Sequence, residues 1–148
     1  MIQARLKELS IEEFANTITH GFGLLLSVVG FVVLLFLAVS HGGAMLIASC
    51  AIYGISLITL YTASTVYHGT TSLELKRKLQ LVDHCCIYLL IAGSYMPFGL
   101  VIIGGRLGQE LLIAMWAFAT VGIVAKLILR HRYPAVSVIS YLIMGWLG

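Results

Sequence analysis

The chain has 148 residues, of which 60% are hydrophobic and only 10% are charged, and its formal net charge is +3. A soluble globular domain carries about 25% charged residues. The composition therefore excludes a soluble globular protein and predicts an integral membrane protein. A charge of this size indicates no nucleic-acid partner, and the expected partners are membrane lipids.

Five apolar segments predict membrane helices, because a helix needs roughly 20 apolar residues to cross a bilayer. They cover approximately residues 17–40, 44–67, 81–103, 111–129 and 135–148. Runs such as LLLSVVGFVVLLFLAV lack the alternation of membrane strands. We therefore predict an all-α, polytopic transmembrane helix bundle with a single domain over residues 1–148. The fifth segment is short and incomplete, so either it only dips into the membrane or the chain is the N-terminal part of a longer one, and we favour the second.

Basic residues gather on one side of these segments. The N-terminal region, the second and fourth connections and the end of span four hold Arg5, Lys7, Lys76, Arg77, Lys78, Lys126, Arg130 and Arg132. The other two connections hold only Arg106. The positive-inside rule then predicts a multi-pass protein of the inner (plasma) membrane with a cytoplasmic N-terminus.

The first span begins with a polar stripe. Glu13, Asn16 and His20 follow an i, i+3, i+7 pattern, which places them on one helical face. Ionisable residues in spans are costly and usually face the interior of a bundle, so each is a functional candidate. A local role for Glu13 stays open, because Ser10-Ile11-Glu12-Glu13 matches a capping box.

The second span ends with a serine and a histidine. Ser64 and His68 are four residues apart, so they lie on one face of the helix, one turn apart, together with Tyr61. Two simpler interpretations stay open. A histidine near the membrane interface can act only as an anchor, and a serine can bond to a carbonyl of its own helix.

The connection that follows has two interpretations. Thr71-Ser72-Leu73-Glu74 matches a capping box, which favours a short interfacial helix running directly into span three, whereas its basic residues also suit a solvated loop. In span three, one face carries Asp83, Cys86, Leu90 and Ser94, and His84 points about 100° away. The cysteines Cys50, Cys85 and Cys86 are predicted to be reduced and buried.

Three consecutive helices thus place ionisable residues at one depth near the predicted cytoplasmic face. Imidazole, carboxylate and hydroxyl groups together form the ingredients of a metal or acid–base site. Zinc suits these donors, with His68 as the best single ligand and Asp83 as a direct or water-mediated second. A catalytic zinc needs three protein ligands, so the predicted zinc site is incomplete.

Three motifs resemble the hemolysin III family: EEFANTITHGFG at 12–23, ASTVYHGT at 63–70 and LVDHCCIYLLIAGSYMPF at 81–98. That family is grouped with the progestin and adipoQ receptors and is more distantly similar to alkaline ceramidases. The resemblance implies seven spans, a cytoplasmic N-terminus and a zinc site near the cytoplasmic side. It implies that His68 is a zinc ligand with Ser64 beside it, and that Asp83 holds or polarises the zinc-bound water. The remaining ligands would be an HxxxH pair on the seventh helix, which this sequence does not contain.

The resemblance leaves three functions open. The first is a zinc-dependent hydrolase of a lipid amide, in which Asp83 orients the water or accepts its proton and Ser64 donates to the developing oxyanion. The second is a channel-forming cytolysin, and the third is a receptor-like membrane-homeostasis protein with structural zinc. The lipid substrate and the oligomeric state are not specified by the sequence.

Overall fold

In the computed structural model, the described part of the chain is helical and has no strand, which confirms the predicted all-α class. The structure describes the backbone of residues 2–130 and 132–147, and the side chains of 10–130, 132–133 and 135–147. The elements are the α-helices α1 (Ile2–His41), α2 (Ala44–Gly69), α3 (Leu73–Pro97), α4 (Gly105–Leu129) and α5 (Pro134–Trp146), and the π-helix η1 (Phe98–Ile103) between α3 and α4.

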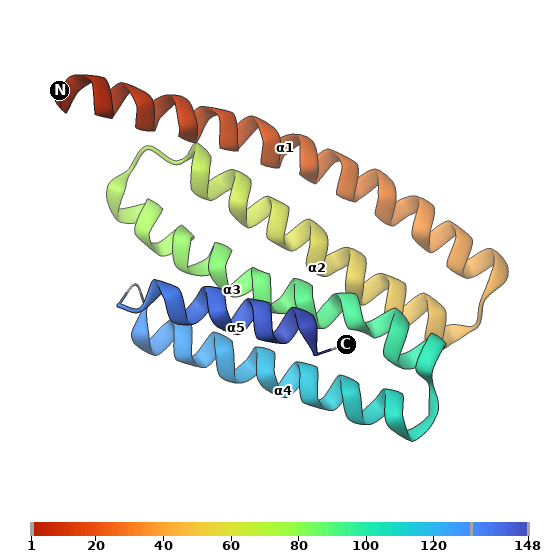
Figure 1. Ribbon diagram of the computed structural model, residues 1–148. Helices are drawn as coiled ribbons and strands as arrows, with labels where there is room; N and C mark the ends of the chain where they lie inside the picture. The colour runs from red at the N-terminus through yellow and green to blue at the C-terminus, as the bar shows by residue number, and fades with distance from the viewer. Residues whose placement is uncertain (1, 131, 148) are drawn as a thin grey trace.

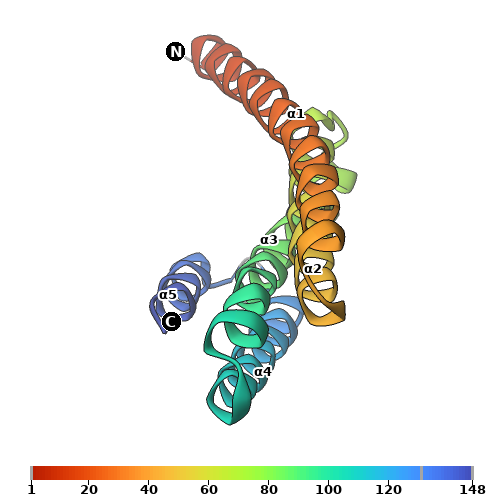
Figure 2. The same ribbon diagram turned by 90° about the vertical axis from the view of Figure 1, so that its right-hand side faces the viewer.

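Consecutive α-helices run in opposite directions (Figure 1). Helix α1 packs against α2, α2 against α3 and α3 against α4, while α5 folds back onto α3 and α4. Figure 2 shows α5 on one side of α3, with α1 and α2 on the other. The N-terminus and the α2–α3 and α4–α5 connections share one end of the bundle, called here the basic end because it holds Lys76, Arg77, Lys78, Arg130 and Arg132. The side chains of Arg5 and Lys7 lie outside the described ones.

In the part of the chain that the structure describes, four helical segments are long and apolar enough to cross a membrane, namely Ser10–His41, Ala44–Gly69, Leu73–Ile103 and Gly105–Leu129. They agree with the four full-length spans predicted from the sequence, and α5 is a shorter apolar helix as expected. Large apolar side chains of α1 point outward, among them Phe14, Phe22 and Phe36, which are 59–69% exposed. Such a surface suits lipid rather than water.

Two helices begin earlier than the apolar segments that they contain. Helix α1 begins at Ile2 and runs through Ser10 without a break, so the predicted capping box at Ser10 is wrong: no helix starts there. Helix α3 begins at Leu73 with Ser72 as its N-cap. The connection is therefore a helix that runs directly into span three, as the first interpretation predicted, and not a solvated loop. The Ser72 side chain makes no capping hydrogen bond.

The third span ends in a π-helix that the sequence did not predict. The Gly104 N–H donates to the Gly99 carbonyl, five residues earlier, at 3.1 Å, which is the bonding pattern of a π-turn. Gly104 and Gly105 then adopt φ angles of 60° and 56°, a region that favours glycine. The chain reverses here and enters α4.

Close contacts between helices depend on small residues. A side chain at Gly54 would collide with the ring of Phe31 on α1, so glycine lets α1 and α2 approach closely, as is common between membrane helices. The main buried cluster joins α3, α4 and α5 and consists of Tyr88, Ala92, Met115, Ala119 and Met144. The cysteines are free, as predicted; Cys50 and Cys86 are buried as expected, whereas Cys85 is only half-buried.

Candidate functional site

A cavity of about 300 Å³ lies where α1, α2 and α3 meet near the basic end. We call it the site cavity. Its lining residues are His20, Leu60, Tyr61, Ser64, His68, Asp83, His84 and Ile87. Ser64 and Asp83 are 4% and 8% exposed, so a hydroxyl and a carboxyl group face the cavity from buried positions. Four residues singled out by helical spacing in three different segments therefore share one cavity: His20, Ser64, His68 and Asp83.

His68 is held from the side of α1. Its Nδ1 atom lies 2.7 Å from Oε2 of Glu13. The same carboxylate oxygen accepts a bond from Nζ of Lys76 at 2.9 Å. The side chains of His68, Lys76 and Glu13 are 16%, 21% and 34% exposed, so this contact is partly shielded from solvent. Glu13 is thus a partner of His68 rather than a helix cap.

Lys76 is the member of this group that the sequence did not single out. Its Nζ atom reaches back from the first turn of α3 to the carbonyl oxygens of His68 and Thr70, both at 3.4 Å. The ammonium also lies 5.1 Å from the centre of the Tyr67 ring, within range of a cation–π contact. Its position in a run of three basic residues gave no signal that it turns inward.

The imidazole rings of His20 and His68 stack face to face, with centres 5.2 Å apart and planes inclined by 3°. The ring of Tyr61 lies 6.0 Å from that of His20. Tyr61 can approach α1 because Gly23 has no side chain, and a Cβ there would collide with the Tyr61 ring. The third residue of the predicted stripe, Asn16, is half-buried but lines neither the site cavity nor the groove beside it.

That groove opens on the other side of His68. It has a volume of about 660 Å³ and is lined by Ser10, Glu13, Phe14, Thr17, His68, Gly69, Thr70, Thr71, Leu73 and Lys76. His68 is the residue that lines both the groove and the site cavity. Its ring therefore stands between the groove near the basic end and the buried hydroxyl and carboxyl groups of α2 and α3.

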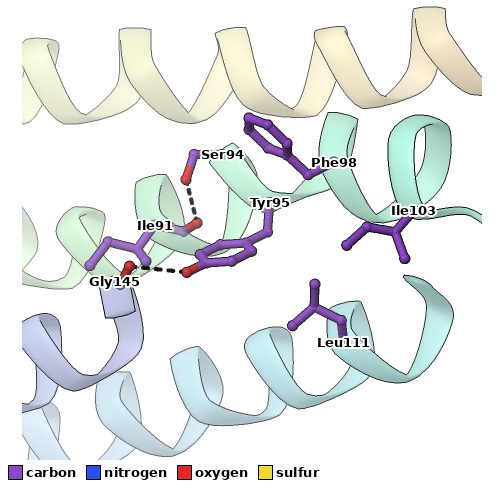
Figure 3. Close-up of a pocket in the computed structure, with 7 residues that line it drawn as sticks. All are labelled: Ile91, Ser94, Tyr95, Phe98, Ile103, Leu111 and Gly145. Atoms are coloured by element: carbon purple, nitrogen blue, oxygen red, sulfur yellow. Dashed lines mark hydrogen bonds between the residues drawn. The ribbon is translucent and has the colours of Figure 1, made fainter. Parts of the chain in front are cut away.

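A separate cavity of about 390 Å³ lies near the opposite end, between α3, η1, α4 and α5 (Figure 3). Its lining is mainly apolar, and its two hydroxyl side chains already donate hydrogen bonds. Ser94 donates to the Ile91 carbonyl at 2.8 Å, and Tyr95 donates to the Gly145 carbonyl at 3.1 Å. This cavity offers an apolar space but no acid–base group comparable to those of the site cavity.

Comparison with known proteins agrees with this arrangement. The profile of the family described as haemolysin-III related matches residues 10–148. The chain belongs to that family. The resemblance inferred from the three motifs is thus confirmed, and all three motifs lie inside the matched region.

Individual members of the haemolysin III-related family and more distant relatives are similar over most of this chain. The chain is 45% identical to the hemolysin-3 homolog of Bacillus subtilis over 92% of its length, and 39% identical to hemolysin-3 of Bacillus cereus over 97%. It is 30% identical to the human monocyte to macrophage differentiation factor over 96%. These matches cover 64%, 65% and 60% of the three relatives, so the chain spans somewhat less than two thirds of their length. No solved structure matches the chain.

The donor set for a metal in this haemolysin III-related chain is partial. His68 and Asp83 line one cavity and are types that bind zinc. Among the residues that the structure describes, however, no group of three histidine, cysteine, aspartate or glutamate side chains lies close enough to hold an ion. The described residues alone therefore do not complete a metal site, and His68 and Asp83 would need a further donor to hold zinc.

A second polar group was also missed by sequence reasoning. Lys126 on α4 is 4% exposed, and its Nζ atom donates to Oγ of Ser137 on α5 at 3.1 Å. On α5, Ser140 shares a hydrogen bond of 2.6 Å with the hydroxyl of Tyr88. These contacts join α3, α4 and α5 near the basic end.

Proposed function

We propose that this protein binds zinc at the site cavity and hydrolyses an amide bond of a membrane lipid, near the cytoplasmic face of the plasma membrane. The observation that carries the proposal is the shared cavity of His68, Asp83 and Ser64. An imidazole, a carboxyl group and a hydroxyl from two neighbouring helices meet there, each largely buried. The family resemblance supports the same residues.

Zinc would be held by His68 together with donors beyond those brought together here, with Asp83 interacting through the zinc-bound water. When bound, zinc lowers the pKa of a coordinated water toward about 7 and so supplies a nucleophile at neutral pH. His68 supplies an imidazole ligand. Glu13 constrains one edge of its ring and His20 stacks on one face.

Asp83 and Ser64 have distinct roles in this proposal. The Asp83 carboxylate accepts a proton from the attacking water and then delivers it to the departing amine, as a general base and acid. The Ser64 hydroxyl donates a hydrogen bond to the amide oxygen as that oxygen gains negative charge. Water adds to the carbonyl carbon, the carbon–nitrogen bond breaks, and the products are a fatty acid and an amine.

A non-enzymatic role with structural zinc is the second candidate. It is favoured by the contact of Glu13 with both His68 and Lys76, which already joins α1, α2 and α3. An ion at His68 would strengthen that junction without any turnover. The channel-forming role has less support, because the site's ionisable residues gather near one end of the described spans and a water-filled pore needs polar groups along its length.

The test is turnover by the protein expressed from its complete open reading frame. Purified protein in liposomes is given a ceramide-like N-acyl lipid, and released fatty acid is measured by mass spectrometry. We expect Asp83→Asn and Ser64→Ala each to lower the rate by about 100-fold or more, while His41→Ala, at the opposite end of α1, keeps it. No release from any N-acyl lipid, with zinc still bound, would favour the structural role. Dye leakage from the liposomes that survives His68→Ala would favour the cytolysin.

A further inference from the structure

We propose that Glu13 is a positioning residue for His68: it keeps the ring proton on Nδ1 and leaves Nε2 available to the site cavity. The inference deepens the proposed function, because it names the residue that prepares His68 for ligation. Glu13 itself lines the groove and not the site cavity, so it acts through His68.

The geometry supplies the first step. A carboxylate oxygen can only accept a hydrogen bond, so the 2.7 Å contact requires the proton to lie on Nδ1 of His68. In a neutral imidazole the other nitrogen, Nε2, then carries the lone pair. A lone pair is what a metal ligand or a proton acceptor needs, and the histidine ligands of metal sites commonly donate their second ring nitrogen to a carboxylate.

The second step is the constraint on the ring. Lys76 binds the same oxygen of Glu13 at 2.9 Å and is itself anchored on the carbonyls of His68 and Thr70. The carboxylate is therefore fixed from both sides. The stacked ring of His20 covers one face of His68, which limits rotation of the ring and leaves its edges for bonding.

In a simpler account, the Glu13–Lys76 ion pair only links α1 to α3, and His68 lies beside it without depending on Glu13. The two accounts differ in one observable, the tautomer of His68. We would record nitrogen-15 spectra of the chain with labelled histidine rings in detergent, at about pH 9, above the ordinary histidine pKa of about 6.5. The His68 signals are assigned as those lost in His68→Gln.

In the unaltered chain, His68 is expected to carry its proton on Nδ1. Glu13→Ala should convert it to a mixture of tautomers, and Glu13→Gln, whose amide oxygen can still accept, should restore the Nδ1-protonated form. The matched control is Glu12→Ala on the exposed neighbour, which should change nothing. Should Glu13→Ala not fold, Glu13→Leu, which also lacks an acceptor and is closer to glutamate in volume, takes its place with the same expected mixture of tautomers. Protonation on Nε2 alone or on both nitrogens, or a tautomer unchanged in Glu13→Ala, would overturn the inference.

Zinc binding provides the second measurement. Glu13→Ala should weaken zinc binding by about 10- to 100-fold in the protein from the complete open reading frame, as removal of such carboxylate partners does elsewhere, and Glu12→Ala should not. If the tautomer responds as expected and no zinc binds to any form, the positioning of His68 stands and the proposed function falls. If zinc binds but the tautomer does not respond, the positioning role falls alone.

Discussion

The rings of His20 on α1 and His68 on α2 lie face to face, 5.2 Å apart and inclined by only 3°. Forty-eight positions separate the two residues in the sequence, yet both line one cavity together with Asp83 of α3. The stack fixes the side of His68 that Glu13 does not reach. The position of the His68 ring therefore depends on residues of α1, although the ring lines a cavity that it shares with Ser64 of α2 and Asp83 of α3.

We expect His20→Ala to lower the free energy of unfolding by about 1 kcal/mol, because the stacked pair is lost. His20→Phe should recover most of that loss, since an aromatic ring can still stack. Unfolding in mixed detergent micelles, followed by circular dichroism, measures both. Thr19→Ala is the control, because the Thr19 hydroxyl bonds only to carbonyls of its own helix. Equal effects of His20→Ala and His20→Phe would show that stacking contributes nothing.

The contact between Gly54 and Phe31 should tolerate no added side chain. A Cβ at Gly54 would collide with the Phe31 ring, so Gly54→Ala should cost about 1–3 kcal/mol of unfolding free energy by overpacking. Gly30→Ala is the matched control, because nothing lies near its added methyl group. The same unfolding measurement applies, and a Gly54→Ala variant as stable as Gly30→Ala would contradict the close packing of α1 on α2.

The Lys126–Ser137 hydrogen bond is expected to stabilise the junction of α4 with α5. Ser137→Ala removes the hydroxyl that accepts a hydrogen bond from the buried Lys126 ammonium group and should cost about 1–3 kcal/mol. Adding Lys126→Met should recover part of the loss, since both polar groups are then gone. Ser40→Ala, an exposed serine that bonds to its own helix, is the control. A double variant less stable than Ser137→Ala would show that the buried lysine has another stabilising partner.

The charge distribution predicts that the basic end faces the cytoplasm. Lys78 and Arg106 have side chains that are 70% and 92% exposed at opposite ends, so each can be replaced by cysteine in a background without the native cysteines. In intact cells, a membrane-impermeant maleimide should label Arg106→Cys and not Lys78→Cys. The reverse labelling would place the N-terminus outside and the candidate site near the outer face.

Helical periodicity and charge were sufficient to predict the spans and the shared depth of the site residues. Ser64 and His68 share a face because they are four residues apart, and Asp83 enters the bundle from the same end as His68 leaves it. These relations depend only on helix geometry and topology. The alternative in which Ser10 and Glu13 cap the start of a helix was wrong, because α1 begins at Ile2 and the Glu13 carboxylate instead contacts His68 and Lys76.

Other features depended on tertiary structure that no local pattern carries. Lys76 reaches Glu13 because the short α2–α3 connection turns the first turn of α3 back toward α1, and its neighbours Arg77 and Lys78 have the same charge in the sequence. The π-helix after Pro97 ends with a hydrogen bond from the Gly104 N–H to the Gly99 carbonyl, and nothing in the local sequence distinguishes it from a continuing α-helix. The Lys76 side chain finds Glu13 only after the helices have packed.

Zinc content is the most direct test of the central claim that His68 belongs to a metal site. Protein from the complete open reading frame is purified without added chelator, and zinc per chain is measured by mass spectrometry for the unaltered protein, His68→Ala and His41→Ala. The account predicts about one zinc per chain in the unaltered protein and in His41→Ala, and a loss of most of it in His68→Ala. Equal zinc in all three forms, or none in the unaltered protein, would contradict it.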